Sequence, residues 1–286
     1  MKVNTLTLTS ANIPDSLKSV EPKPHQLYWT GIPLNKILTK PRVGIVGSRK
    51  ATNYGRVVTH DLAAKLARAG VVVISGLAFG IDSYAHKAAL EAGGCTVAVL
   101  PSSLQEIYPA SHRNLAQQIL KNDGALVSEY PPETDVRSHN FIARNRLISG
   151  LVDVLVITEA AKNSGSLHTA RFALEQGKTV MAVPGNIHSP TSEGCNNLIK
   201  SGAIPVTDVN DIFFALKIQP TVKPVTIIKG TPEQRQIFEL IADGVRMQEE
   251  LAAVSQLPVP EISSTLTTLE LQGYIRPIGG GAWTIA

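Results

Sequence analysis

The segment GSRKAT, residues 47–52, gathers side chains that can hold a phosphate group. Gly47 permits a tight turn, and Arg49 adds a permanent positive charge beside it. Ser48 and Thr52 carry hydroxyls that can donate hydrogen bonds to phosphate oxygens. The segment matches neither the G-x-G-x-x-G dinucleotide fingerprint nor the GxxxxGK phosphate loop. We therefore expect this segment to bind a phosphodiester group. The alternative is a structural turn in which Arg49 forms an ion pair with a surface carboxylate.

Three more phosphate-compatible turns follow apolar runs that are typical of buried strands. In a parallel sheet such turns lead into helix N-termini, whose N–H groups and dipole attract anions. Because ligands bind outside the carboxyl ends of parallel strands, we expect the turns to line one common site. They comprise residues 75–80, the turn Ser164–Gly165–Ser166 and residues 184–186.

The segment VRSHNFIARNRLISG, residues 136–150, places cations around an aromatic ring. Phe141 offers a stacking face to a base, and the cations can follow a phosphate backbone. These cations are Arg137, His139, Arg144 and Arg146. The pattern is typical of single-stranded nucleic-acid binding. The alternative is a core position for Phe141, with the arginines in solvated surface pairs.

Residues for catalysis are harder to find. Asp82 and His86 are spaced to share a helix face and could orient a general base, but a structural pair is favoured. No HExxH or GxSxG motif occurs, and no histidines have metal-ligand spacing. Cys95 and Cys195 lie outside any CxxC motif. We therefore predict no catalytic residue, no metal and no cofactor.

These residues need a scaffold, and a repeated pattern between residues 43 and 216 supplies it. β-branched runs alternate with amphipathic segments, two of which end at glycine, as in a parallel sheet with helices on both faces. We predict an α/β fold with a Rossmann-like, doubly wound, mostly parallel sheet. The expected strands are Val43–Val46, Val71–Ser75, Thr96–Leu100, Ala125–Ser128, Val152–Thr158, Thr179–Val183 and Ile204–Val206.

The rest of the chain divides into shorter segments. Residues 1–40 are expected to form an extended lead-in to the Rossmann-like domain of residues 41–217, and residues 218–230 a linker. In residues 231–286, Thr231 as N-cap and Pro232 start the first of three short helices, and a glycine-turn hairpin follows them. This order predicts a small C-terminal winged-helix domain.

The composition favours a folded protein of the reducing cytoplasm. Of the 286 residues, 43% are hydrophobic and 17% are charged, and we expect neither a membrane span nor a secretory signal. Residues 231–286 contain three arginines, no lysine and seven aspartates or glutamates, so their net charge is −4, whereas that of the whole chain is +4. The other residues therefore carry +8, which suggests a polyanion partner for them, although such a charge is also ordinary for their number.

Seven motifs in order resemble the DNA-processing protein A family, also called DprA or Smf. They are GIVGSRKATNYG, SGLAFGIDSYAHKAAL, SEYPP, FIARNRLISGL, SGSLHTARFAL, AVPGN and EGCNNLIKSGA. The resemblance covers roughly residues 24–216, and it implies a homodimer that binds single-stranded DNA. It also implies loading of the recombinase RecA during natural transformation, without catalytic turnover.

On the matching positions, the resemblance places the DNA site at Arg49 and Phe141, with Arg144 and Arg146 nearby. The segment around Phe141 departs from the family pattern in two ways, and LPSSLQEIYP has two serines where members commonly carry a glycine-containing turn. Ile142 stands where the family has a proline, and a lysine that is common shortly before the phenylalanine is missing.

Two other functions compete with this interpretation. A phosphoribohydrolase-like Rossmann enzyme would need a PGGxGTxxE motif, but the segment after Thr169 reads ARF and lacks the carboxylate. A transcription factor would need a basic recognition helix, whereas PEISSTLTTLELQG has no lysine or arginine. The winged helix is therefore predicted to contact a protein rather than duplex DNA.

Overall fold

The computed structural model describes residues 3–8, 13–134, 136–219, 228 and 230–285. The chain forms two compact units, Met1–Pro220 and Thr221–Ala286. The larger unit is built on a nine-stranded sheet. Its strands are β1 (Asn4–Thr7), β2 (Gln26–Gly31), β3 (Arg42–Val46), β4 (Val72–Ser75), β5 (Thr96–Val99), β6 (Ala125–Ser128), β7 (Val154–Ile157), β8 (Thr179–Ala182) and β9 (Ile204–Pro205).

The strand order reverses in the middle of this sheet. The order is β1-β2-β6-β5-β4-β3-β7-β8-β9, so the chain builds outward from β3 to β6 and then returns to the other side of β3 with β7. Strands β3 to β9 run parallel, while β2 pairs antiparallel with both β1 and β6. Such a reversal opens a crevice at the carboxyl ends of the two central strands, here β3 and β7.

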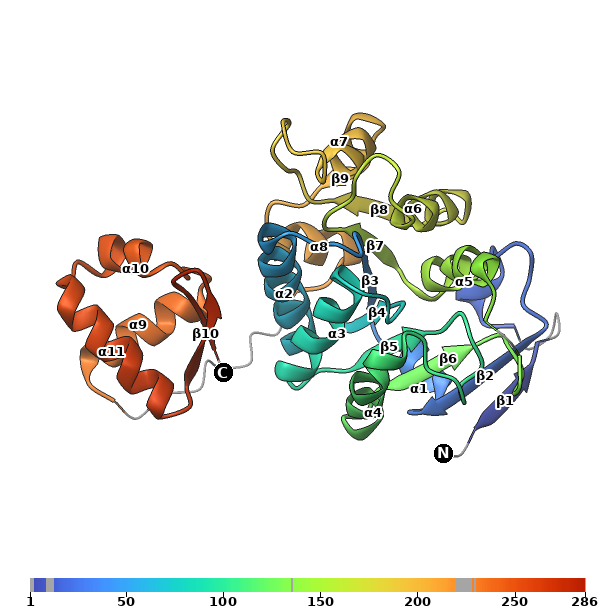
Figure 1. Ribbon diagram of the computed structural model, residues 1–286, viewed down its shortest axis with the longest axis horizontal. Helices are drawn as coiled ribbons and strands as arrows, with labels where there is room; N and C mark the ends of the chain where they lie inside the picture. The colour runs from blue at the N-terminus through green and yellow to red at the C-terminus, as the bar shows by residue number, and fades with distance from the viewer. Residues whose placement is uncertain (1–2, 9–12, 135, 220–227, 229, 286) are drawn as a thin grey trace. The chain divides into compact units, whose positions relative to one another are not determined.

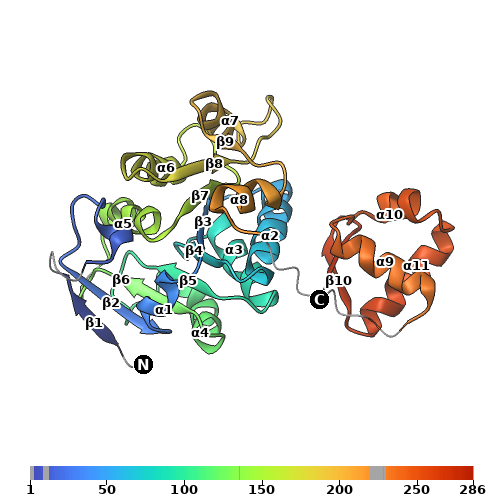
Figure 2. The same ribbon diagram turned by 180° about the vertical axis from the view of Figure 1, so that it is seen from behind.

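Helices cover both faces of the sheet, as Figures 1 and 2 show from opposite sides. One face packs against α2 (Asn53–Arg68), α3 (Ile81–Glu91), α4 (Arg113–Lys121) and α8 (Val209–Leu216). The other packs against α1 (Leu34–Leu38), α5 (Ser138–Leu151), α6 (Ser166–Glu175) and α7 (Glu193–Lys200). Strands β3 to β7 are buried along their whole length, which explains their continuous apolar runs.

The predicted fold class is confirmed. Each of the seven expected strands is present, with ends that differ by no more than two residues. Residues expected as an extended lead-in contribute β1 and β2 to the sheet edge. Of the expected linker, residues 220–227 and 229 lie outside the described residues. No helix in the described part of the chain is long and apolar enough to span a membrane.

The smaller unit is a winged helix with its own core. Its elements are α9 (Pro232–Ala242), α10 (Gln248–Ser255), α11 (Val259–Leu271), β10 (Ile275–Gly279) and β11 (Ala282–Ile285). Ile237, Leu251 and Ile262 are fully buried between the helices. Thr231 caps α9 as predicted, because its hydroxyl accepts a hydrogen bond from the Gln234 N–H at 3.3 Å while the Gln234 side chain accepts one from the Thr231 N–H.

Candidate functional site

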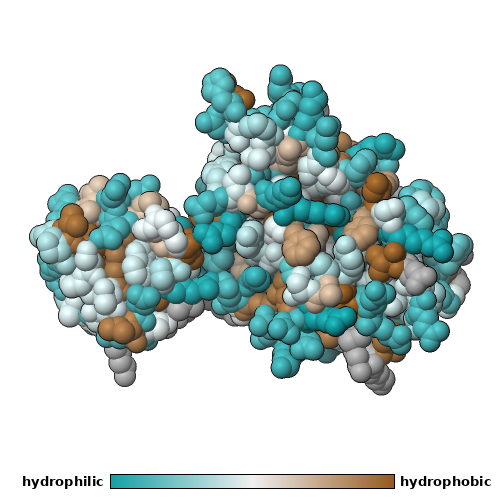
Figure 3. Space-filling view, in the orientation of Figure 1, coloured by the Kyte–Doolittle hydropathy of each residue, from teal (hydrophilic) through white to brown (hydrophobic). Residues whose placement is uncertain are grey.

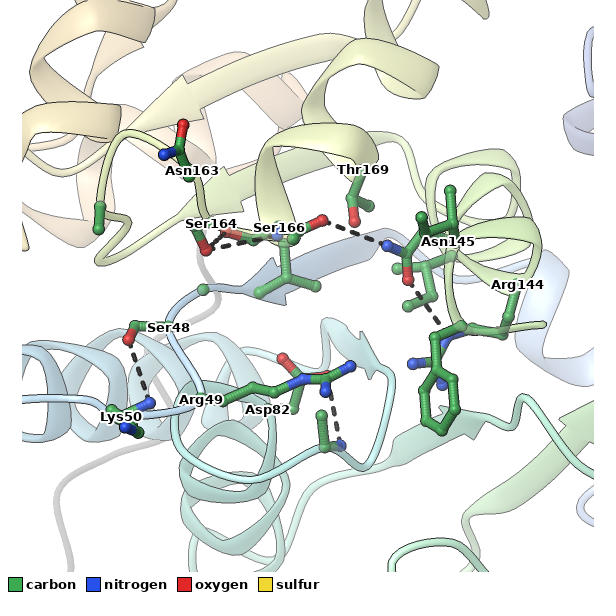
Figure 4. A pocket seen from close by; sticks show the side chains of 18 of the residues that line it. Ser48, Arg49, Lys50, Asp82, Arg144, Asn145, Asn163, Ser164, Ser166 and Thr169 are labelled. Carbon is green, nitrogen blue, oxygen red and sulfur yellow. Dashed lines mark hydrogen bonds between the residues drawn. The ribbon is translucent and has the colours of Figure 1, made fainter. Parts of the chain in front are cut away.

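A pocket of about 620 Å³ lies where the strand order reverses, and we call it the crevice pocket. Its walls come from the β3–α2 turn, the β7–α6 turn and one face of α5 (Figure 4). Of the four turns expected to share a site, the first three reach this pocket. The turn at residues 184–186 does not line it, although Thr191 farther along the same loop does.

The β3–α2 turn is held in place by backbone hydrogen bonds from both sides. The Ser48 N–H donates to the Glu159 carbonyl at 2.7 Å, and the Ile81 N–H donates to the Ser48 carbonyl at 3.1 Å. Gly47 has no room for a side chain, since a Cβ there would lie 2.7 Å from the same Glu159 carbonyl. The turn is therefore built into the fold, and a ligand does not have to order it.

Arg49 brings a cation to this pocket. Its side chain extends from the turn toward α5 (Figure 4), and its guanidinium lies 5.3 Å from the centre of the Phe141 ring. No carboxylate forms an ion pair with Arg49 within the described part of the chain. The alternative of a surface-paired arginine is therefore not what the structure shows, and the charge faces the pocket.

The opposite wall is the N-terminal end of α6. Ser164 and Ser166 share a hydrogen bond of 2.8 Å between their hydroxyls, and the Asn145 amide donates to the Gly165 carbonyl at 3.4 Å. A Cβ at Gly165 would meet nothing within 4 Å, so the backbone there is open to a ligand. Hydroxyls and a helix N-terminus on this wall suit an anion.

Helix α5 presents one face to the pocket and hides the other. The lining residues Phe141, Ile142, Arg144, Asn145 and Ile148 follow the spacing of a single helix face. Phe141 is partly exposed, and its ring meets that of Tyr108 edge to face at 5.1 Å. The alternative of a core position for Phe141 is therefore not what the structure shows, and the ring lies beside the Arg49 cation.

Arg144 lines the floor of the pocket but is almost entirely buried. The side chain is only 3% exposed and donates to the carbonyls of Gly76, at 2.7 Å, and Val99. Burial lowers the pKa of Arg144 to about 10, although the Asp82 carboxylate opposes this shift, so the group stays charged at neutral pH. It therefore adds positive potential to the floor while its hydrogen bonds are used within the protein.

Three predicted contact residues have other positions. Arg146 is 4% exposed, does not line the pocket, and makes a two-pronged ion pair with Glu129 at 2.7 and 2.9 Å. Arg146 lies five residues after Phe141 on α5, and a helix makes one turn every 3.6 residues, so the two side chains leave the helix on different faces. Thr52 caps α2 and donates its hydroxyl proton to Glu159, at 3.1 Å. Arg137 is exposed at the N-cap of α5, outside the pocket lining.

Asp82 and His86 do not bond to each other. Asp82 accepts the Gly76 N–H at 3.0 Å, and burial raises its pKa. His86 donates from Nδ1 to Thr96, whose hydroxyl proton goes to the Val73 carbonyl. Burial lowers the pKa of His86 to about 3, so the ring is neutral. Both side chains hold the scaffold together.

Sequence reasoning missed five polar residues of the pocket, namely Lys50, Asn145, Asn163, Thr169 and Thr191. Lys50 follows Arg49 directly and could have been included on its charge alone. Asn145 stands one turn after Phe141 and could have been found from helical spacing. Within the described residues, no group of three or more His, Cys, Asp or Glu side chains could hold a metal ion.

Comparison with known sequences gives consistent matches to one family. Residues 4–217 match the family described as DNA recombination-mediator protein A, and residues 222–281 match its DprA winged helix domain. Protein Smf of Escherichia coli is 42% identical over 251 residues, which cover 84% of this chain and 67% of that protein.

Solved structures give the same result. The DNA processing protein A of Streptococcus pneumoniae superposes with a TM-score of 0.69 at 36% identity, over 74% of each chain. That of Helicobacter pylori, whose structural study concerns its single-stranded DNA binding mode, gives 0.67 at 33% identity over 76% of this chain and 96% of its own.

Proposed function

Because this chain belongs to the DNA recombination-mediator protein A family, also called DprA or Smf, we propose that it binds single-stranded DNA in the crevice pocket. The observation that carries the proposal is the pairing of Arg49 with the partly exposed ring of Phe141 at 5.3 Å. The Arg49 cation can bind the phosphate backbone while the neighbouring Phe141 ring stacks on a base, and such stacking needs a strand whose bases are unpaired. The single-strand binding mode of the Helicobacter pylori relative supports this choice of ligand.

The pocket offers separate groups for phosphates and for bases. Arg49, Lys50 and the hydroxyls of Ser48 and Ser164 provide charge and hydrogen bonds for phosphate oxygens. Phe141 provides the stacking surface, and Arg144 strengthens the positive potential from below. The one carboxylate among the lining residues, Asp82, accepts backbone N–H groups, so it holds the 76–78 loop rather than activating a water molecule.

We infer further that the protein acts in the cytoplasm as a homodimer and delivers its strand to the RecA recombinase during natural transformation. The family's description as a recombination mediator supports this role. Two pockets on one strand would raise the affinity through effective concentration without any new contact. We assign it no catalytic turnover.

The test is fluorescence anisotropy with a labelled oligo-dT strand and with the matching duplex, at several salt concentrations. We expect the wild type to prefer the single strand, with a log–log salt slope near −0.7 for each phosphate contacted. Arg49→Ala should weaken binding by about tenfold and reduce that slope. Arg171→Ala, which removes an exposed arginine paired with Glu175, is the control of equal charge and should change little.

Equal affinity for single strand and duplex, or no binding, would contradict the proposal. Nucleotide hydrolysis would then be the activity to assay, because a phosphoribohydrolase-like enzyme would use the same crevice of the sheet.

A further inference from the structure

A second, smaller pocket of about 100 Å³ adjoins the crevice pocket. The two pockets share Arg49, Ala78, Phe141 and Arg144, so they are separated by the Arg49–Phe141 pair. The outer wall of the smaller pocket consists of Phe79, Tyr108 and Pro109, and we call it the aromatic pocket. A chain molecule that leaves the crevice pocket over Arg49 would enter it next.

The aromatic rings of this pocket are unusually exposed. Phe79 is 50% and Tyr108 is 44% accessible to solvent. On the larger unit, the space-filling view shows apolar side chains in small groups set among hydrophilic ones (Figure 3). Single exposed apolar residues need no explanation, but two aromatic rings beside an arginine with no carboxylate partner in the described chain suggest a binding role.

Ring contacts hold both aromatic side chains in place. Phe79 meets the His112 ring edge to face at 5.0 Å, and Tyr108 meets Phe141 in the same way at 5.1 Å. An edge-to-face contact occupies at most one face of one ring of the pair, so these contacts leave ring faces open for stacking. The rings are thus positioned before any ligand arrives.

The backbone under Phe79 is also constrained. Leu77 is fully buried and has a φ of 57°, a left-handed conformation that costs a leucine energy and persists only where the surroundings impose it. Its carbonyl accepts a hydrogen bond from Nδ1 of His112 at 2.8 Å. The Ala78 N–H is bound by Asp82 at 3.4 Å. Strain of this kind is concentrated at ligand-binding segments.

We propose that the aromatic pocket is a second base-stacking subsite for single-stranded DNA, reached from the crevice pocket over Arg49. This inference rests on the proposed function and extends it. One phosphate group bound by Arg49 would lie between two bases, one stacked on Phe141 and the next against Phe79 and Tyr108. Aromatic stacking accepts any base, so the subsite would lengthen the bound strand without selecting a sequence.

The test compares two substitutions at Phe79 that differ in the ring. Phe79→Leu keeps an apolar side chain but removes the ring, whereas Phe79→Tyr keeps the ring. We measure affinity for oligo-dT strands of increasing length, each also made with one 2-aminopurine, a base whose fluorescence falls when it stacks. Leu174→Ala, at an exposed apolar position on α6, is the control, and thermal melting checks that all variants fold.

We expect Phe79→Leu to bind long strands about tenfold more weakly and to match the wild type on the shortest strand that binds. Fluorescence quenching at one 2-aminopurine position should disappear in Phe79→Leu and persist in Phe79→Tyr. Unchanged affinity and quenching in Phe79→Leu, with single-strand binding intact, would refute the subsite alone. Absence of single-strand binding in the wild type would refute the proposed function as well.

Discussion

Arg49 and Arg144 show how burial separates two side chains of the same chemistry. Arg49 is exposed and has no carboxylate partner in the described chain, so its charge is available to a phosphate, whose condensed counterions are released on binding. Arg144 is 3% exposed, and its guanidinium hydrogen-bonds the Gly76 and Val99 carbonyls. The first is placed to bind a ligand, and the second to hold the loop that shapes the pocket.

Arg144→Ala should therefore act on stability. It leaves Asp82 buried without its nearby positive charge and two carbonyls without a donor, and breaking such a buried arrangement costs about 3–5 kcal/mol. Arg49→Ala should stay within about 0.5 kcal/mol of the wild type. Urea denaturation measures both. A stable Arg144→Ala protein that has lost only DNA binding would show that Arg144 contacts the ligand directly.

His86 should make the protein sensitive to acid. Its pKa is lowered from 6.5 to about 3 in the folded state, so between these pH values the unfolded chain binds a proton that the folded protein does not. The free energy of unfolding should therefore fall as the pH drops below 6.5, by about 2 kcal/mol at pH 5. His86→Gln removes this contribution. If the free energy of unfolding fell equally in the wild type and in His86→Gln between pH 7 and 5, His86 would not be the source of the acid sensitivity.

At the scale of elements, the crevice pocket depends on loops that touch at the backbone. The start of α3 approaches the β3–α2 turn so closely that a Cβ on Gly80 would lie 2.2 Å from the Ser48 carbonyl. Gly93, just beyond the other end of α3, has a similar positive φ but nothing within 4 Å. Both glycines have a positive φ, but only a side chain at Gly80 would also clash with the turn that lines the crevice pocket.

Gly93→Ala should lose about 1–2 kcal/mol, the cost of a side chain in the left-handed conformation, and should bind DNA normally. Gly80 has a φ of 72° and a ψ of −127°, a conformation that only glycine adopts readily, and an alanine there must also push the Ser48 backbone away. Gly80→Ala should therefore lose more stability than Gly93→Ala and weaken single-strand binding. Urea denaturation and anisotropy on the same two variants give the comparison. Identical results for the two would mean that the Gly80 contact does not position the turn.

For the whole molecule, the two units differ in the sign of their net charge. Residues 231–286 carry −4 and residues 1–230 carry +8, and α11 has no lysine or arginine to contact a duplex. Each unit has a hydrophobic core of its own, so the larger one does not need the smaller one to complete its packing. We therefore expect DNA affinity to reside in the larger unit and the winged helix to contact a protein.

Removing residues 221–286 should leave the affinity for oligo-dT unchanged or slightly higher, because a negative charge is lost with them. The same titration with duplex DNA should show no loss of duplex binding. A tenfold weaker complex with either DNA after truncation, at physiological salt, would show that the winged helix binds DNA after all.

The sequence by itself determined the architecture. Alternating β-branched and amphipathic segments predicted all seven parallel strands, and Thr231 with Pro232 predicted the start of the winged helix, because these signals are local and recur at a regular period. The glycine turns predicted the edge of the sheet at which the pocket lies. Only the tertiary structure decided which basic residues face that pocket: Arg49 does so as an exposed side chain, Arg144 lines the floor while almost fully buried, and Arg146 is paired with Glu129 outside the lining. The physical reason is that charge and spacing are properties of the chain, whereas exposure and ion pairing depend on residues distant in sequence that folding brings together.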